Sequence, residues 1–376
     1  MTRALRLIAL VLAVVGTAAT LGPVSALPSN AATAFAQPPL PPNATVVASG
    51  LLNPRGFTFA PDGALIVAES GAAPAGFEAL GGPPTPTFRP GTSLSGRVSR
   101  VNLATGERTT LAEGLPSAAL SFGDTLGPAN VAYLGSDLYV AISAGPVHGW
   151  PNYPSGVYRV NPDGGVRLVA NLDAFNSRNP VALITPDDEI SNPYDMVAAA
   201  GALWITDGNR NQVYKVTPDG TISRVADLST GHPVTTGIMA GPGGALIVVE
   251  LTPVPFPQGA GRIQRISPDG QVETMATGTT TAVGVAMAAD GTMFVVEHSV
   301  SLGRPPFLAP FTGRVARLTA DRTLVTVADN LMFPTIARVG PDGALYVANF
   351  SVGGDNGEGQ ILRIDTGARP AVQIPR

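Results

Sequence analysis

Cysteine is absent from this chain of 376 residues, and charged residues make up only 13% of it. The lack of cysteine excludes disulfides, thiolate zinc sites, iron–sulfur clusters and cysteine nucleophiles. It also excludes a cysteine-linked lipid anchor. Any bound metal must therefore use oxygen or imidazole ligands.

Basic clusters are missing as well. The formal net charge is −4, and no run of Lys and Arg is interleaved with aromatic residues. A protein that binds nucleic acid needs positive charge to displace the counterions of the phosphate backbone. We therefore expect no nucleic-acid partner.

Helical periodicity is also missing after residue 40, where no window of 11 to 18 residues keeps apolar side chains at helical spacing. The chain has instead 44 Gly and 36 Pro, and short β-branched runs lie between Gly, Pro and Asp. Such runs, bounded by turn residues, are typical of strands. The sequence predicts an all-β protein.

The first 36 residues have the pattern of a signal peptide. Arg3 and Arg6 precede an apolar run over 7–15, and Ala34-Phe35-Ala36 offers a cleavage site. This pattern predicts export to the cell envelope or the medium, with no membrane attachment after cleavage. The alternative is an uncleaved anchor, because the apolar stretch over 5–21 approaches the ~20 residues that span a bilayer.

A repeated unit occupies the rest of the chain. Each of its six copies contains an apolar pentad, and five of the six pentads end in an oxygen-bearing residue. The pentads end at Glu69, Ile142, Asp207, Glu250, Glu297 and Asn349.

A second element in each copy alternates apolar with mostly basic or polar residues, so that one face packs and the other is solvated. These elements lie at 97–101, 157–160, 213–216, 262–266, 314–318 and 361–364. Tight Pro-Asp-Gly turns, such as Pro61-Asp62-Gly63, separate the strands, because Pro presets φ and Gly accepts positive φ.

The period of the repeat identifies the architecture. Val98 and Ile361 stand five copies apart, which gives about 53 residues per copy and matches propeller blades rather than short solenoid repeats. The sixth copy lacks a closing strand, whereas residues 45–51 have the pattern of one. We predict a monomeric six-bladed β-propeller of four antiparallel strands per blade, closed by its N-terminal strand. The expected boundaries are a signal peptide over 1–36, a linker over 37–44, the propeller over 45–366 and a tail over 367–376.

Long insertions concentrate on one face of this propeller. The connections over 70–95, 143–155, 172–193, 251–260 and 298–312 all lie on the face where the pentads end, whereas the other face has short turns. Insertions in repeat proteins gather on the binding face. We expect a small molecule or a protein partner there, although the loops could also serve as rigid covers. Their apolar residues are Phe77, Phe88, Trp150, Tyr153, Phe256, Pro305, Pro306 and Phe307.

The same face gathers candidate metal ligands. The pentad ends place Glu69, Asp207, Glu250 and Glu297 around the channel, and Asn130 and Asp195 stand at the starts of two innermost strands. Converging carboxylate and amide oxygens suit Ca²⁺. The alternative is that each carboxylate accepts backbone N–H groups at the end of its strand.

Histidine is scarce, with three residues in the chain. His148 and His298 are candidate general bases beside a metal-bound water. The alternative is that they are solvated loop residues, as is His232. No nucleophile elbow, zinc-binding helix motif or phosphate-binding loop occurs in the sequence.

The opening of the first copy resembles the ScyD/ScyE family of exported propellers. The resemblance rests on the segments 52–57 (LNPRGF), 61–69 (PDGALIVAE) and 96–98 (GRV), and it extends over the mature chain. NHL-type and TolB-like propellers share these blade motifs. The resemblance implies export and six blades, and it carries no catalytic residues across.

Two enzyme groups share further features. Asn130 and Asp195 are similar to metal-holding positions of the gluconolactonase group, although that group has a Glu where this chain has Arg55-Gly56. Quinoprotein sugar dehydrogenases share the Asn-Pro-Arg-Gly opening. Two functions stay open: a binding or scaffold propeller, and a metal-dependent hydrolase of the lactonase type, with a quinone-dependent oxidoreductase as a variant of the enzyme alternative.

Overall fold

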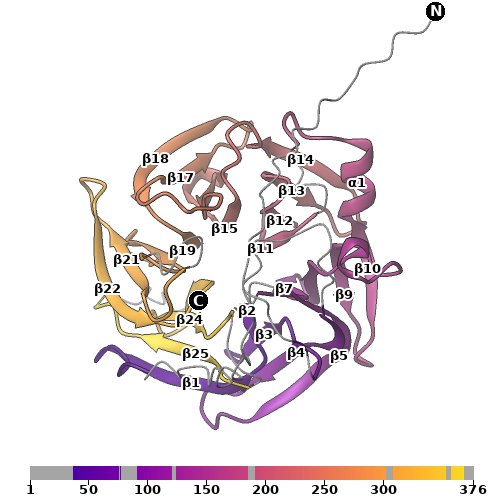
Figure 1. Ribbon diagram of the computed structural model, residues 1–376, viewed down its shortest axis with the longest axis horizontal. Helices are drawn as coiled ribbons and strands as arrows, with labels where there is room; N and C mark the ends of the chain where they lie inside the picture. Colours follow the sequence, from indigo (N-terminus) through magenta and orange to yellow (C-terminus); the bar gives the residue numbers. More distant parts are fainter. Residues whose placement is uncertain are drawn as a thin grey trace, which may run out of the picture. The chain divides into compact units, whose positions relative to one another are not determined.

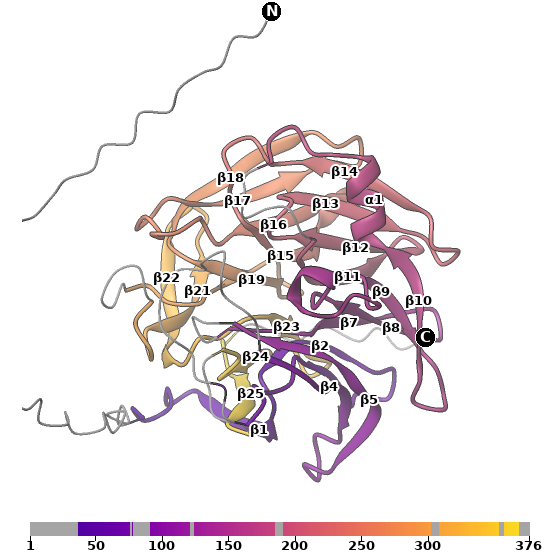
Figure 2. The ribbon, with the colours of Figure 1, turned by 45° about the vertical axis from the view of Figure 1, so that its right-hand side comes forward.

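The computed structural model describes residues 37–75, 77, 91–120, 124–184, 191–301, 308–352 and 357–367. Contacts divide the chain into the units Met1–Gln37 and Pro38–Arg376. The second unit is a six-bladed β-propeller (Figures 1 and 2), which confirms the predicted fold. The predicted signal peptide over 1–36 lies outside the described residues, as does nearly all of the predicted tail.

Each blade is an antiparallel sheet; in the first five blades the strands follow the chain order, the first blade has a short fifth strand, and the sixth takes β1 as its outer strand. From the first blade to the sixth, the innermost strands β2, β7, β11, β15, β19 and β23 contact one another in succession around the channel, and β2 contacts β24 of the sixth blade. The blades are β2(Pro54–Phe59), β3(Leu65–Glu69), β4(Gly91–Val101), β5(Arg108–Ala119), β6(Thr125–Leu126); β7(Pro128–Leu134), β8(Asp137–Ile142), β9(Gly156–Val160), β10(Val166–Asn171); β11(Pro193–Ala199), β12(Ala202–Asp207), β13(Gln212–Val216), β14(Ile222–Asp227); β15(Thr235–Ala240), β16(Leu246–Glu250), β17(Gly261–Ile266), β18(Val272–Thr279); β19(Ala282–Met287), β20(Met293–Glu297), β21(Gly313–Leu318), β22(Leu324–Leu331); and β23(Ala337–Val339), β24(Leu345–Asn349), β25(Gly359–Ile364), β1(Ala44–Leu51).

The ring closes as predicted. Strand β1 pairs antiparallel with β25, with Ala44 opposite Ile364 and Leu51 opposite Gly359. The Nδ2 of Asn43 adds hydrogen bonds to the carbonyl oxygens of Asp365, at 3.0 Å, and Val327, at 3.1 Å. The N-terminal strand thus supplies the outer strand that the sixth repeat lacks, and it covers an edge that would otherwise be open to pairing.

Six clusters of buried apolar side chains fill the six interfaces between neighbouring blades. The pentads explain this arrangement, because successive side chains of a strand point to opposite faces. Leu65 and Val67 pack toward the sixth blade, whereas Ile66 and Ala68 pack toward the second. Both faces of each blade are therefore buried, and this is why the pentads are continuously apolar.

Two features depart from the sequence analysis. Strands β4 and β5 form a long ribbon in which Gly91 pairs with Ala119, so part of the expected loop over 70–95 is strand. The connection over 172–193 contains a short helix, α1(Leu172–Arg178), whose N-cap Asn171 accepts a hydrogen bond from Ala174 N at 2.8 Å. Seven residues are too few to give the periodic signal of a helix. Two 3₁₀ turns, η1(Pro146–His148) and η3(Pro242–Gly244), also lie among the described residues. No helix among the described residues is long and apolar enough to cross a membrane.

Candidate functional site

The glutamates at the pentad ends are held within their own blades. Glu69 receives the Nε of Arg97 at 2.8 Å, its Nη2 at 2.7 Å, and the backbone N–H of Leu52 at 2.7 Å. Glu297 binds Arg314 and the N–H of Thr280 in the same way. The arginine stands opposite the glutamate on the next strand, so the pair joins two strands and caps the turn before the blade.

The other pentad ends follow this scheme with different partners. Glu250 accepts hydrogen bonds from Arg262, at 2.8 Å, and Gln264, at 3.0 Å. Asp207 stands opposite Gln212, and its oxygens accept from Tyr214 Oη at 2.5 Å and Asn192 N at 2.9 Å. Burial raises the pKa of Asp207.

The expected convergence of these groups on a metal is not found. Within the described residues, no three His, Asp or Glu side chains lie close enough together to hold a metal ion. The carboxylates instead accept backbone N–H groups and arginine side chains at their strand ends. Arginines from the adjacent strands balance the charge of the glutamates.

Asn130 and Asp195 are brought together, but they point toward neighbouring blades. Asp195 is fully buried and accepts hydrogen bonds from the Nδ2 of Asn130, the backbone N–H of Met196 at 2.7 Å and the N–H of Ile238 at 2.8 Å. Its fourth donor is the Nη2 of Arg338, at 2.5 Å, which comes from β23 in the sixth blade. Asp195 thereby links four blades, and a guanidinium supplies its counter-charge.

Glycines allow the innermost strands to approach closely beside this pair. A Cβ at Gly56 would lie 2.5 Å from the Cγ of Asn130, and a Cβ at Gly284 would lie 2.5 Å from the carbonyl oxygen of Thr335. Such distances leave no room for any side chain. The glycines of the innermost strands are therefore required for ring packing.

The innermost strands begin at one end of the channel, which we call the mouth. At this end, beyond Asn130 and Asp195, irregular pairing at the strand starts directs other side chains into the mouth. The β2–β3 ladder shifts register between Pro54 and Gly56, and the β11–β12 ladder shifts between Pro193 and Met196. A bulge re-aims the side chain that it contains. Arg55 and Tyr194 occupy these bulges, and the Arg55 Cζ lies 5.2 Å from the centre of the Tyr194 ring.

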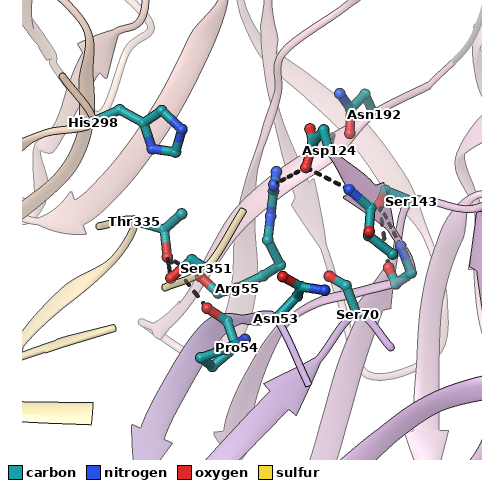
Figure 3. Close-up of polar contacts among 12 residues, drawn as sticks. Asn53, Pro54, Arg55, Ser70, Asp124, Ser143, Asn192, His298, Thr335 and Ser351 are labelled. Carbon is teal, nitrogen blue, oxygen red and sulfur yellow. Dashed lines mark hydrogen bonds and ion pairs between the residues drawn. The ribbon is translucent and has the colours of Figure 1, made fainter. Parts of the chain in front are cut away.

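Arg55 forms an ion pair with Asp124, whose Oδ1 lies 2.5 Å from Arg55 Nη1 (Figure 3). The Asp124 Oδ1 also accepts the N–H of Thr125, at 2.8 Å. Only 8% of the Arg55 side chain is exposed, compared with 20% of Asp124. Burial opposes the charge on Arg55 while Asp124 favours it, and the pKa of Arg55 lies above its ordinary value.

His298 lies beside this pair (Figure 3). Its ring stacks on Phe333, with ring centres 5.0 Å apart, and its Nδ1 lies 2.9 Å from the carbonyl oxygen of Pro334. Because a carbonyl oxygen only accepts, Nδ1 carries the proton and Nε2 keeps a free lone pair. Burial and the nearby Arg55 lower the pKa of His298 to about 4, against smaller opposing effects of the Pro334 carbonyl and Asp124. His298 is neutral at pH 7.

His148 lies near Asp124 from the second blade. It is buried at the end of η1, and its Nδ1 has no hydrogen-bond partner in the described structure. Burial lowers its pKa to about 4, and the charge of Asp124 opposes this only in part. The third histidine, His232, lies apart from this group, with its Nδ1 3.2 Å from Asn211 Nδ2.

We call Arg55, Asp124, His148, Tyr194 and His298 the mouth cluster. The sequence analysis named both histidines of the cluster but neither Arg55 nor Asp124 as site residues. The Pro-Arg-Gly segment carried a signal for Arg55, because the equivalent strand-start positions of the next four blades, Ala129, Tyr194, Thr236 and Val283, carry no charge. Asp124 carried no signal, because it lies in a loop outside the repeat.

The long connections expected on the mouth face lie only in part within the described residues. The blade-two loop is fixed by a hydrogen bond from the Trp150 Nε1 to the carbonyl oxygen of Ser117, at 3.0 Å. Of the other expected apolar loop residues, Phe88, Pro305, Pro306 and Phe307 lie outside the described residues.

Comparisons with known proteins support the fold alone. No family model and no curated protein matches the sequence. The structure is similar to a putative oxidoreductase (glucose dehydrogenase) from Thermus thermophilus, with 16% identity over 87% of this chain and 100% of that one and a TM-score of 0.55. A second structure, named glucose dehydrogenase, gives 13% identity over 86% and 99% with a TM-score of 0.54. A protein of unknown function from Bacteroides thetaiotaomicron gives 9% over 86% and 75% with a TM-score of 0.53.

Proposed function

We propose that this protein is an exported propeller of ScyD/ScyE type that binds a small molecule at the mouth cluster without a metal. One observation carries the proposal. Only 8% of the Arg55 side chain is exposed, and its one hydrogen bond to a described residue is to Asp124. A guanidinium has five N–H donors, and the unpaired nitrogens of Arg55 are not among the fully buried atoms without a partner, so they are accessible to a ligand. A ligand oxygen would satisfy them.

The other members of the cluster define the ligand further. The Nε2 of His298 is an acceptor, and the Oδ2 of Asp124 receives no hydrogen bond from a described residue. Both suit ligand hydroxyl groups. Tyr194 and Phe333 supply flat apolar surface. The combination favours a small polyhydroxylated carbonyl or carboxyl compound, such as a sugar acid or its lactone.

Two of the similar structures are named glucose dehydrogenases. At their low identity they show only the fold, so the ligand class rests on Arg55, Asp124 and His298. The exported location and the monomeric state belong to the same proposal and rest on the sequence of residues 1–36 and on the closed ring.

The metal-dependent lactonase is the alternative, and the donor set does not fit it. Asp195 accepts four donors, one of them the cationic Arg338, so a cation at this position would have to displace a guanidinium. The pentad glutamates are paired within their own blades. The protein's oxygen atoms are therefore used by its own N–H groups.

Calorimetry of the mature protein with D-gluconate and D-glucono-1,5-lactone tests the proposal, in EDTA and then in excess Ca²⁺. We expect saturable binding in EDTA that falls at least about tenfold in Arg55→Met, because a charge-assisted hydrogen bond is lost. Arg317→Met removes an exposed arginine and is the matched control. Arg55→Lys keeps the charge beside Asp124 if the first variant is unstable.

Three results would count against the proposal. They are no binding of either compound, equal binding by Arg55→Met, and binding or lactone hydrolysis that requires Ca²⁺ and is lost in Asp195→Ala. The last result would support the lactonase instead.

A further inference from the structure

The end of the channel opposite the mouth is hollow. One hollow, of ≈ 370 Å³, lies among the ends of strands in blades three to six, and another, of ≈ 290 Å³, lies among those of blades one, two, three and six. Val197 and Arg338 border both. We call the two hollows together the lower vestibule. The first has the volume of a small-ligand pocket.

The wall of the first hollow is about half apolar, and that of the second is mainly polar. Met239, Val285, Met287 and Val339 line the first hollow, and aromatic side chains, Phe59 and Tyr133, line the second. A chain of several methylene groups would be removed from water there, and methionine adapts to irregular apolar shapes.

Among the described residues that line the two hollows, Arg338 is the one cation, and it borders both. Arg338 donates through Nη2 to Asp195, at 2.5 Å, and through Nη1 to the carbonyl oxygen of Ala337, at 2.9 Å. Its Nε–H has no acceptor among the described residues, and 16% of the side chain is exposed. Donors of this group are thus available to a second anion.

The positive charge of Arg338 is not fully used by Asp195. Its carboxylate also accepts two backbone N–H groups and the amide of Asn130, each of which stabilises the negative charge independently of Arg338. An anionic head on Arg338 would therefore add a hydrogen bond without removing the partner of Asp195.

We propose that the lower vestibule binds a small amphipathic carboxylate, whose head lies on Arg338 and whose apolar chain lies against Met239 and Met287. This site is independent of the mouth cluster. The inference unites a guanidinium that has free donors with a hollow whose wall is partly apolar, which is the combination that such a ligand requires.

Methyl-labelled methionine provides the test by NMR, with octanoate as the probe. We expect octanoate to shift the Met239 and Met287 methyl resonances saturably and to leave Met332, at the mouth end of the ring, in place. Octan-1-ol, with the same chain and no charge, should bind at least about tenfold more weakly. Resonances are assigned with Met239→Leu and Met287→Leu.

Two variants complete the test. Val339→Asp places a carboxylate in the half-buried wall and should weaken octanoate binding about tenfold through like-charge repulsion. Val325→Asp, at an exposed position on β22, is the matched control and should bind octanoate normally. Absence of a saturable shift, a shift at Met332 instead, equal binding of octan-1-ol, or unchanged binding by a folded Val339→Asp would each overturn the proposal.

Discussion

Two aspartate–arginine pairs lie at successive levels of the same channel, and they differ in how completely they are satisfied. Asp195 is fully buried, receives four donors and joins four blades. Asp124 is partly exposed, and both it and Arg55 keep hydrogen-bonding groups that no described residue uses. The carboxylate of the first pair is filled by donors of the protein and holds the ring together, whereas the second pair leaves an acceptor on its carboxylate as well as donors on its arginine.

The largest expected effect on stability comes from breaking the Asp195–Arg338 pair. Asp195→Ala leaves the Arg338 guanidinium without its counter-charge and several N–H groups without an acceptor. We expect the free energy of unfolding to fall by about 3–5 kcal/mol, the usual cost of breaking a buried pair. Urea unfolding followed by tryptophan fluorescence measures it. Asp124→Asn, in the Arg55–Asp124 pair, is the comparison and should lower the free energy of unfolding by about 1 kcal/mol. Equal losses at the two sites would show that the two pairs do not differ in how they stabilise the ring.

The neutral histidines beside the Arg55–Asp124 pair predict that the stability of the protein depends on pH. The pKa of His298 is about 4 in the folded protein, below the value of about 6.5 in an unfolded chain. The unfolded state therefore binds the proton more readily, and stability falls as the pH drops from 6.5 toward 4. The slope per histidine approaches about 1.4 kcal/mol per pH unit. Unfolding at pH 7.0, 5.5 and 4.5 should show a smaller loss in His298→Gln than in the wild type, and an identical pH profile would show that His298 is not buried in its neutral form.

Close packing at the level of Asp195 is tested by Gly56→Ala. Its Cβ would lie 2.5 Å from Asn130 Cγ and 2.6 Å from the Ala129 carbonyl oxygen. We expect a loss of about 2–3 kcal/mol from overpacking. Gly106→Ala has open space around it and a positive φ, so it should lose only about 1 kcal/mol. Thermal melts of both variants measure these losses. A Gly56→Ala variant as stable as Gly106→Ala would show that the innermost strands are farther apart.

The smallest effect concerns the pairs within the blades. Glu297 and Arg314 occupy the positions that Asn349 and Gln360 occupy in the sixth blade. Glu297→Gln or Arg314→Gln alone should each cost about 1–2 kcal/mol, and the double variant should cost less than the sum of the two. A double-mutant cycle by urea unfolding measures the coupling. Strict additivity would mean that the two side chains do not interact.

The sequence predicted the fold because its signals repeat. Pentads, Pro-Asp-Gly turns and the strand at 45–51 each follow from local chemistry, and the six copies reinforce one another. The site was predicted less well. Glu69 and its equivalents share a position in the repeat, which suggested a ring around the channel, but their direction depends on the arginine or glutamine of the adjacent strand.

The Arg55–Asp124 pair joins residues 69 positions apart. One of them comes from a bulge and the other from a loop outside the repeat, so their contact depends on the closed ring. Arg338 likewise reaches Asp195 from the opposite side of the channel, 143 positions along the chain. No local pattern reports such contacts.

A crystal structure of the mature protein grown with D-gluconate in EDTA tests the central claim most directly. We predict ligand density in the mouth, with an acceptor oxygen within hydrogen-bond distance of Arg55 and a hydroxyl group on the Nε2 of His298, while Asp195 keeps Arg338 as its partner. An empty mouth at saturating ligand, with Arg55 closed on further protein acceptors, would contradict the account.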